Sequence, residues 1–229
     1  MSGSGPSLSS RNLWAKREAK CLAILERALL LLRLKTSLPE AEVELNRLLY
    51  FCLLKATSEL YPNDDIGPVS ECNNQPGADD EARTTREQKR PDFQWIFRDK
   101  YEADPNRSSK QFVVECKRLG RSTRTDWILN KNYVNHGVCR FRDRQWAYAQ
   151  RFPSGVMVGY WQNMEADEIL AEVTDEMHKN LLPDLVRKGN WNTCAVSQLE
   201  HSFERSFKIS PFQLRHLWID LRFNDVLSI

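Results

Sequence analysis

Two short apolar segments, each with charged residues at one end, constrain the fold of this chain most strongly. Pro91-Asp92-Phe93 opens the first segment, and Gln111–Lys117 forms the second. Side chains of a strand alternate between the faces of its sheet, so Glu115 and Lys117 share one face. The polar linker 99–110 predicts that the two strands form a hairpin. Such a hairpin is expected to bring Asp92 beside Glu115 and Lys117 at one edge of a mixed sheet.

Two carboxylates and a lysine in this arrangement suit a protein that holds Mg²⁺ and hydrolyses a phosphodiester. Mg²⁺ prefers oxygen ligands, keeps several waters and usually takes one or two carboxylates from the protein. Asp92 and Glu115 meet that requirement, and the backbone carbonyl of Cys116 is a candidate third ligand. The alternative is an ordinary surface strand, on which Glu115 and Lys117 merely pair across solvent.

The motif resembles the PD-(D/E)xK superfamily of restriction-endonuclease-like nucleases, over roughly residues 39–160. Pro91, Asp92, Glu115 and Lys117 carry the resemblance, supported by the apolar residues that precede Glu115. A second stretch is similar to small bacterial restriction and phage-defence nucleases. Its matching residues are Tyr133, Gly137, Arg140-Phe141, Tyr148 and the run 155–160.

The resemblance implies an α/β fold with a restriction-endonuclease-like core, in which helices flank a central mixed β-sheet. It implies a DNA endonuclease of bacterial defence or restriction, using Mg²⁺, with Mn²⁺ as a substitute. A cytoplasmic location is expected separately, because the start of the chain lacks the basic and apolar regions of a signal peptide. Asp92 and Glu115 would hold the metal, and Lys117 would orient or deprotonate water, or stabilise the phosphate. Members of the superfamily often add a helix glutamate. Glu44 is the candidate here, and Glu42, its competitor, could simply be solvated.

Basic residues cluster just after the motif and predict contact with a phosphate backbone. The candidate DNA-binding residues are Arg118, Arg121, Arg124, Lys131, Arg140, Arg144, Gln145 and Tyr148. Gln145 and Tyr148 stand where some exonuclease-like members have Gln-x-x-x-Tyr, but the spacing here is one residue shorter. A solvated helix face is the alternative for the arginines, and core packing is the alternative for Tyr148.

Composition excludes several other classes of protein. The net charge of +2 is small, and six cysteines without a Cys-x-x-Cys pair argue against zinc and against an oxidising compartment. No segment is expected to span a membrane, because charges interrupt the apolar run 22–34. The tryptophans mostly sit among apolar residues and are expected in the core. A stacking platform for single-stranded DNA would need aromatic side chains exposed on a groove.

Hydrophobic periodicity predicts a single domain after a flexible tail at residues 1–10. Residues 11–36 form a helical extension, and residues 37–229 form the α/β core with a second helix capped by Ser37. The polar segment 63–90 is expected to be a long loop, either disordered or a DNA-contacting flap. Further helices are expected at 126–133, 142–151 and 165–182, strands at 155–162 and 214–221, and irregular or partly helical structure at 183–210.

Two rivals to a nuclease remain open. The chain could be a nucleic-acid-binding subunit that kept the fold with weak catalysis, or an interaction protein that docks through the helix 22–34. A nuclease of this type often works beside an ATPase or helicase and dimerises to cut both strands. Lys117→Ala is expected to abolish cleavage and leave folding intact, because a lysine at a strand edge contributes little to a core.

Overall fold

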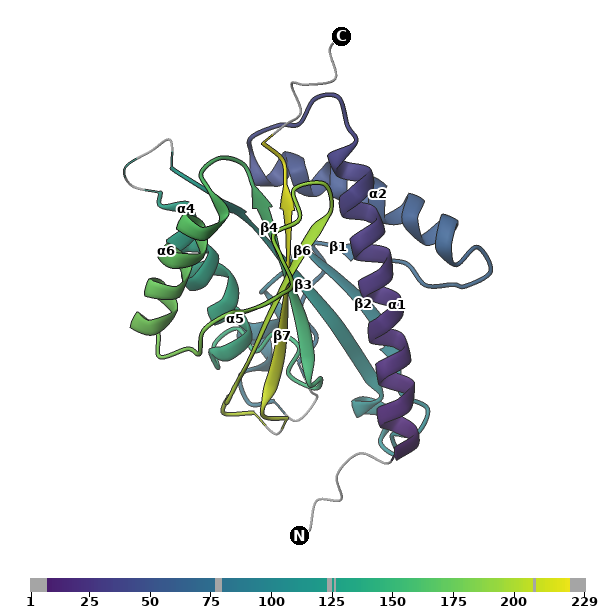
Figure 1. Cartoon of the computed structure of the whole chain (residues 1–229). Helices are drawn as coiled ribbons and strands as arrows, with labels where there is room; N and C mark the ends of the chain where they lie inside the picture. Colours follow the sequence, from purple (N-terminus) through teal and green to yellow (C-terminus); the bar gives the residue numbers. More distant parts are fainter. Residues whose placement is uncertain (1–7, 77–79, 123–124, 126, 208, 223–229) are drawn as a thin grey trace.

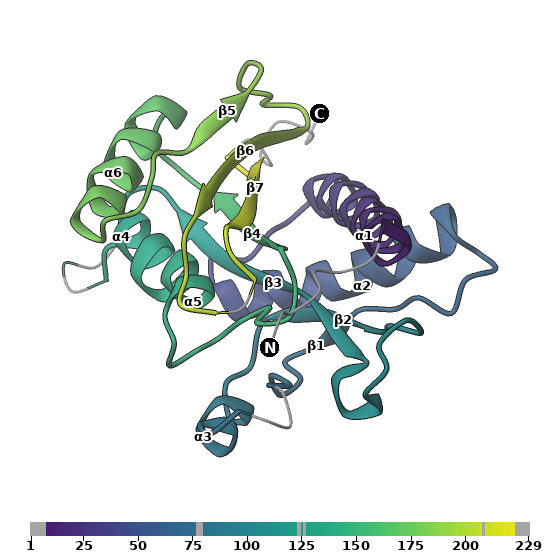
Figure 2. The same ribbon diagram turned by 90° about the horizontal axis from the view of Figure 1, so that it is seen from below.

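A seven-stranded mixed sheet forms the centre of the molecule, and helices cover both of its faces (Figures 1 and 2). The computed structural model describes residues 8–76, 80–122, 125, 127–207 and 209–222. The sheet order is β1-β2-β3-β4-β7-β6-β5, with β3, β4 and β7 mutually parallel and the remaining pairs antiparallel. The strands are β1 (Val69–Ser70), β2 (Phe93–Arg98), β3 (Ser109–Leu119), β4 (Ser154–Trp161), β5 (Val186–Lys188), β6 (Val196–Phe203) and β7 (Phe212–Asp220). The predicted α/β class and mixed sheet are confirmed.

Two layers of helices enclose this sheet. The helices are α1 (Leu8–Arg33), α2 (Glu42–Leu60), α3 (Arg83–Glu87), the 3₁₀ turn η1 (Pro105–Arg107), α4 (Leu129–Tyr133), the π-helical turn η2 (Val134–Val138), α5 (Cys139–Arg142) and α6 (Ala166–Lys179). The pair α1 and α2 lies on one side of the sheet, and α4, α5 and α6 lie on the other (Figure 1). The crossover from β3 to β4 therefore runs through α4, η2 and α5, as a parallel pair requires.

The N-terminal helix α1 uses its apolar face inside the domain. Leu25, Leu29 and Leu32 are fully buried, and the helix packs on α2, β6 and β7. These leucines are thus occupied inside the domain, which argues against docking of a partner through the helix 22–34. No helix in the described ranges, α1 included, combines the length and apolar character needed to cross a membrane.

Helix α2 begins four residues later than predicted. Its N-cap is Ala41, in an extended conformation, and not Ser37. Leu38 precedes Pro39, and a residue before proline is disfavoured in the helical region, so the chain reaches α2 through an extended segment. Glu42 consequently becomes the first helical residue, which changes the position expected for its side chain.

Residues 143–152 form a loop of turns rather than the predicted helix, since α5 ends at Arg142. Ala147 and Ala149 adopt positive φ, which an α-helix excludes. The guanidinium of Arg205, which follows β6, donates to loop carbonyls that include Tyr148 O at 3.2 Å and Phe152 O at 2.6 Å. We call residues 143–152 the Arg205-bound loop.

The segment 183–210 contains strands β5 and β6 rather than irregular structure. In β6 the side chains of Leu199, His201 and Phe203 are buried at alternate positions, which is the strand period. The prediction failed because polar residues between them hid that alternation. The final strand β7, at Phe212–Asp220, confirms the prediction for 214–221.

The polar segment 63–90 is packed against the domain in the parts that the structure describes. It includes β1 and α3, and it buries Asn74 and Arg86. Asn74 Nδ2 donates to the carbonyl of Trp146 at 3.0 Å, and Arg86 Nε donates to the carbonyl of Arg144 at 2.7 Å. Both contacts fall on the Arg205-bound loop. The expectation of disorder is wrong for residues 63–76 and 80–90.

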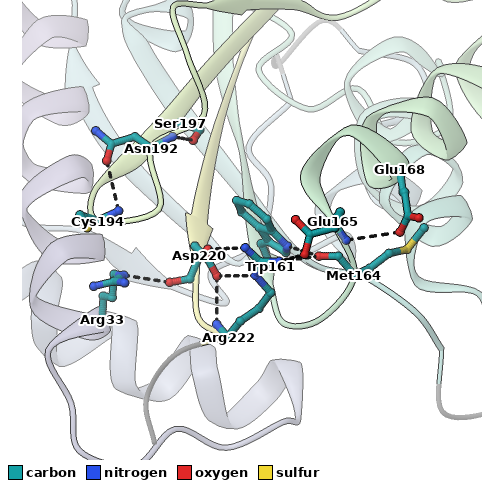
Figure 3. A network of polar contacts seen from close by, with 10 residues as sticks. All are labelled: Arg33, Trp161, Met164, Glu165, Glu168, Asn192, Cys194, Ser197, Asp220 and Arg222. Atoms are coloured by element: carbon teal, nitrogen blue, oxygen red, sulfur yellow. Dashed lines mark hydrogen bonds and ion pairs between the residues drawn. The ribbon is translucent and has the colours of Figure 1, made fainter. Parts of the chain in front are cut away.

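A polar network ties the ends of β4 and β7 to the helices beside them (Figure 3). The guanidinium of Arg222 makes two hydrogen bonds to Asp220 at 3.0 and 3.1 Å and reaches Glu165, the N-cap of α6, at 2.8 Å. Arg33 at the end of α1 donates to the carbonyl of Asp220. These charges are paired with one another, so they stabilise the carboxyl ends of the parallel strands.

Replacement of Arg205 should destabilise the protein strongly. Arg205→Ala removes the donor of several buried carbonyls, and each unsatisfied group costs about 1–3 kcal/mol. We expect a loss of about 3 kcal/mol or more in the free energy of unfolding, measured by urea titration. Arg205→Lys should fall between this variant and the wild type, because one ammonium has fewer donors. Arg47→Ala, on an exposed side chain, is the matched control and should change stability by less than about 0.5 kcal/mol.

Candidate active site

Asp92 and Glu115 lie side by side because of the β2–β3 register. Phe93 pairs with Val114 in this antiparallel ladder, so Asp92, one residue before β2, lies opposite Glu115. Asp92 Oδ2 accepts a hydrogen bond from the backbone N–H of Cys116 at 2.7 Å. The carboxylate is thereby fixed at the carboxyl end of β3, within the predicted hairpin.

The ammonium of Lys117 lies among oxygens from three elements. Its Nζ is 2.9 Å from Glu115 Oε1 and 4.0 Å from Asp92 Oδ2. It donates to Glu42 Oε1 and to the carbonyl of Cys116, both at 2.7 Å. We call these four residues, together with Lys117, the carboxylate–lysine cluster. The convergence expected for Asp92, Glu115 and Lys117 is therefore present, although β3 lies inside the sheet and not at its lateral edge.

Gly137 allows the helical crossover to approach this cluster closely. It lies in the π-helical turn η2, and π turns are frequent at functional sites. A Cβ atom at this position would lie 2.4 Å from Met157 Cε and 3.3 Å from Lys117 Cγ. The absence of a side chain at Gly137 thus leaves room for Met157 and, next to it, for the stem of Lys117.

A second cation, Arg140 of α5, closes the other side of the cluster. Its guanidinium pairs with Glu115 Oε1 and lies 4.3 Å from the centroid of the Trp146 ring. The remaining oxygen of Glu115, Oε2, is buried and has no hydrogen-bond partner among the described residues, and the hydroxyl of Tyr148 is in the same state. Buried polar atoms normally have a partner. The cluster therefore retains an unused acceptor at its most buried carboxylate.

The close carboxylates shift the protonation equilibria of the cluster. Burial, with the nearby charge of Glu115, raises the pKa of Asp92 from 3.8 to about 8. Burial acts to lower the pKa of Lys117, but the charges of Glu115, Asp92 and Glu42 outweigh it and raise that pKa above its ordinary value. Lys117 is therefore an ammonium at neutral pH, and it can donate hydrogen bonds but cannot accept a proton.

The donor atoms are of the element that a hard divalent cation prefers. Asp92, Glu115, Glu42 and the Cys116 carbonyl supply oxygen, which Mg²⁺ prefers, and Glu115 Oε2 is an unpartnered oxygen among them. In the described ranges, however, no group of three or more His, Cys, Asp or Glu side chains is arranged to hold a metal ion. The ammonium of Lys117 occupies the space between the oxygens instead. Metal binding would require that ammonium to shift.

The helix glutamate of the cluster is Glu42, and the prediction of Glu44 is wrong. Glu44 is exposed on α2, whereas Glu42 contacts Lys117. Phe51, two turns after Glu44 on the same helix face, is 65% exposed, so this face of α2 meets solvent. An acidic residue at the true helix start, after Pro39, is the signal that could have identified Glu42.

The candidate DNA-binding residues separate into buried and exposed groups. Tyr148 is fully buried, and Arg140 is engaged by Glu115, so neither presents a free group to a phosphate. Arg140 and Arg144 are also not on one helix, because α5 ends between them. The side chains of Arg121, Lys131, Arg144 and Gln145 are exposed, whereas Arg118 is half-buried and donates to the carbonyl of Glu40. Arg124 lies outside the described residues.

A small cavity lies at the carboxyl end of β3, on the side of the α1–α2 connection. Its volume is about 150 Å³, and its lining includes Arg118, Arg121, Glu40 and Gln162. Ligands of α/β sheets commonly bind beyond the carboxyl ends of the strands. The cavity and the carboxylate–lysine cluster therefore share the end of the sheet where a substrate is expected.

No protein-family model, curated protein or solved structure matches this chain.

Proposed function

We propose that the protein is a Mg²⁺-dependent DNA nuclease with a restriction-endonuclease-like core. The observation that carries the proposal is the position of Lys117 Nζ, which lies 2.9 Å from Glu115 and 4.0 Å from Asp92. Chance pairing on a solvated strand would leave these groups exposed. Here Glu115 has no exposed surface, and Lys117 is 6% exposed. Such burial of charge is costly, and it is typical of sites where charge has a chemical role.

Each residue of the cluster has a distinct role in this proposal. Asp92 and Glu115 hold Mg²⁺, with Glu42 and the Cys116 carbonyl as further oxygen donors. The bound ion supplies charge stabilisation at the scissile phosphate. Lys117 then acts as an ammonium, which orients a water or contacts a phosphate oxygen. Its raised pKa argues against a role as a general base.

Exposed basic side chains near the cluster would bind the phosphates of a nucleic acid. Arg121 and Lys131 lie in the chain between β3, which carries Lys117, and η2, which packs near it. Lys and Arg near a nuclease site neutralise phosphates and give salt-dependent binding. A role in bacterial defence, an ATPase or helicase partner, and a dimer that cuts both strands are parts of the same proposal.

The test is incubation of purified protein with supercoiled plasmid, linear duplex and single-stranded DNA, in Mg²⁺, in Mn²⁺ or in EDTA. The proposal expects cleavage in either metal and none in EDTA. DNA binding that survives EDTA without any cleavage would instead support a catalytically weak binding subunit. Absence of DNA binding at low salt would contradict both readings.

Glu42 and Glu44 offer a matched pair of variants on one helix. Glu42→Gln removes a charge that holds Lys117, so we expect at least a ~10-fold lower cleavage rate, with a raised Mg²⁺ requirement. Glu44→Gln removes a charge from the exposed face and should leave both quantities unchanged. Cleavage rates across a Mg²⁺ titration provide the measurement. Equal effects of the two substitutions would show that Glu42 acts only through the general charge of α2.

A further inference from the structure

Trp127 is the one exposed tryptophan in this protein, all seven of which lie in the described ranges. Its side chain is 48% exposed, whereas the others are buried or half-buried. The interpretation of this residue as core is therefore wrong. An exposed indole beside Ile128, which is 47% exposed, leaves a large apolar surface in water.

The Trp127 ring is held against a second exposed ring. The planes of Trp127 and His136 are 7° from parallel, and their centroids are 6.2 Å apart. The Trp127 backbone is also fixed, because its carbonyl accepts a hydrogen bond from the Ser122 hydroxyl, which in turn accepts from the N–H of Leu129. A ring that is already oriented loses less conformational entropy when a ligand stacks on it.

The two rings belong to segments that adjoin the carboxylate–lysine cluster. His136 directly precedes Gly137, where a Cβ atom would lie 3.3 Å from Lys117 Cγ. Trp127 belongs to the segment that leaves β3, the strand carrying Glu115 and Lys117. Arg121 and Lys131 flank this segment with exposed positive charge. A flat exposed ring in a segment that carries exposed cations on both sides in sequence matches a nucleobase with its flanking phosphates.

We propose that Trp127, supported by His136, is a stacking platform for an unpaired base of a nucleic-acid strand that enters the site. This inference rests on the proposed function and defines its substrate class. A base inside a duplex is already stacked on both faces, so Trp127 can receive only a base in a single strand, a frayed end or a flap. The platform therefore favours substrates with single-stranded character.

Four variants separate stacking from other roles. Trp127→Ala removes the ring, Trp127→Leu keeps an apolar side chain without a π-face, and Trp127→Phe keeps a π-face. Tyr101→Ala is the matched control. Tyr101 is also an exposed aromatic residue, at 53%, but it lies in the β2–β3 connection at the opposite end of β3. Each variant is first compared with the wild type by thermal unfolding.

Affinities for a short oligo(dT) strand and for a blunt duplex are measured in EDTA. We expect Trp127→Ala and Trp127→Leu to weaken oligo(dT) binding by about 10-fold and to leave duplex binding within about 2-fold. Trp127→Phe and Tyr101→Ala should remain within about 3-fold of the wild type for both ligands.

The outcomes distinguish this inference from the proposed function. Equal losses for oligo(dT) and duplex, or a Leu variant that binds oligo(dT) like the wild type, would overturn the platform while leaving the nuclease proposal intact. Wild-type protein that binds oligo(dT) through Trp127 but cuts no DNA in Mg²⁺ would retain the platform and refute the nuclease. Wild-type protein that binds neither ligand would refute both.

Discussion

In Lys117→Met protein, Mg²⁺-dependent DNA cleavage is expected to fall by at least ~10²-fold. Loss of a single donor that stabilises transition-state charge typically costs a factor of about 10²–10³. The same variant should also lose about 3 kcal/mol or more of stability, because it removes a partner of the buried Glu115. This second effect corrects the sequence-based expectation that folding would be unaffected. Cleavage rates and urea midpoints provide the two measurements.

A second lysine of the same strand supplies the control. Lys110 lies at the other end of β3, pairs with Asp99 at 3.7 Å and is more exposed than Lys117. Lys110→Met should leave the cleavage rate unchanged and lower the free energy of unfolding by less than about 1 kcal/mol. Folded Lys117→Met protein with a wild-type cleavage rate would contradict the proposed function. Equal destabilisation by the two variants would contradict the buried ion pair.

Asp92→Asn should abolish cleavage and yet stabilise the metal-free protein at alkaline pH. The buried Asp92 has a pKa of about 8, above its ordinary value, so the folded wild type keeps this carboxyl group neutral at lower pH. At alkaline pH the group ionises in a buried position, which destabilises the fold. This side chain contributes its full stability below about pH 4 and loses it as the pH rises through 8. Asparagine has no such dependence, and its side-chain oxygen can still accept from the Cys116 N–H.

The free energy of unfolding of Asp92→Asn should therefore exceed that of the wild type by an amount that grows from near zero at pH 4 to about 2–5 kcal/mol at pH 9. Thermal unfolding in EDTA at several pH values measures it, with Asp64→Asn as a control on a half-exposed carboxylate. A pH-independent difference would show that Asp92 is ionised throughout the folded state. Mg²⁺ should reverse the order of stability, because only the wild type has a full ligand set.

The sequence predicted those parts of the fold that local pattern determines. Period-2 alternation located β3 and placed Glu115 and Lys117 on one face, and the adjoining strand start located Asp92. Helix α1 and strand β7 were recognisable from their own local hydrophobic patterns. These features depend on neighbours in the chain, which a single sequence displays.

Features that depend on distant partners were missed. The Arg205-bound loop takes its shape from a guanidinium more than fifty residues away, so its residues look helical in isolation. Glu42 enters the cluster because α2 starts after Pro39, and a shift in helix start changes which glutamate faces Lys117. The exposure of Trp127 is likewise a property of packing. Residue type alone does not show which side of an indole meets solvent.

The position of β7 in the sheet determines when the fold can be completed during synthesis of the chain. β7 is the last strand of the described residues, but it lies between β4 and β6 in the interior of the sheet. A chain on the ribosome therefore carries Asp92, Glu115 and Lys117 well before β4 has its second neighbour and before Arg205 can hold the loop beside Arg140. The sheet around β4 can therefore be completed only after β7 has been synthesised.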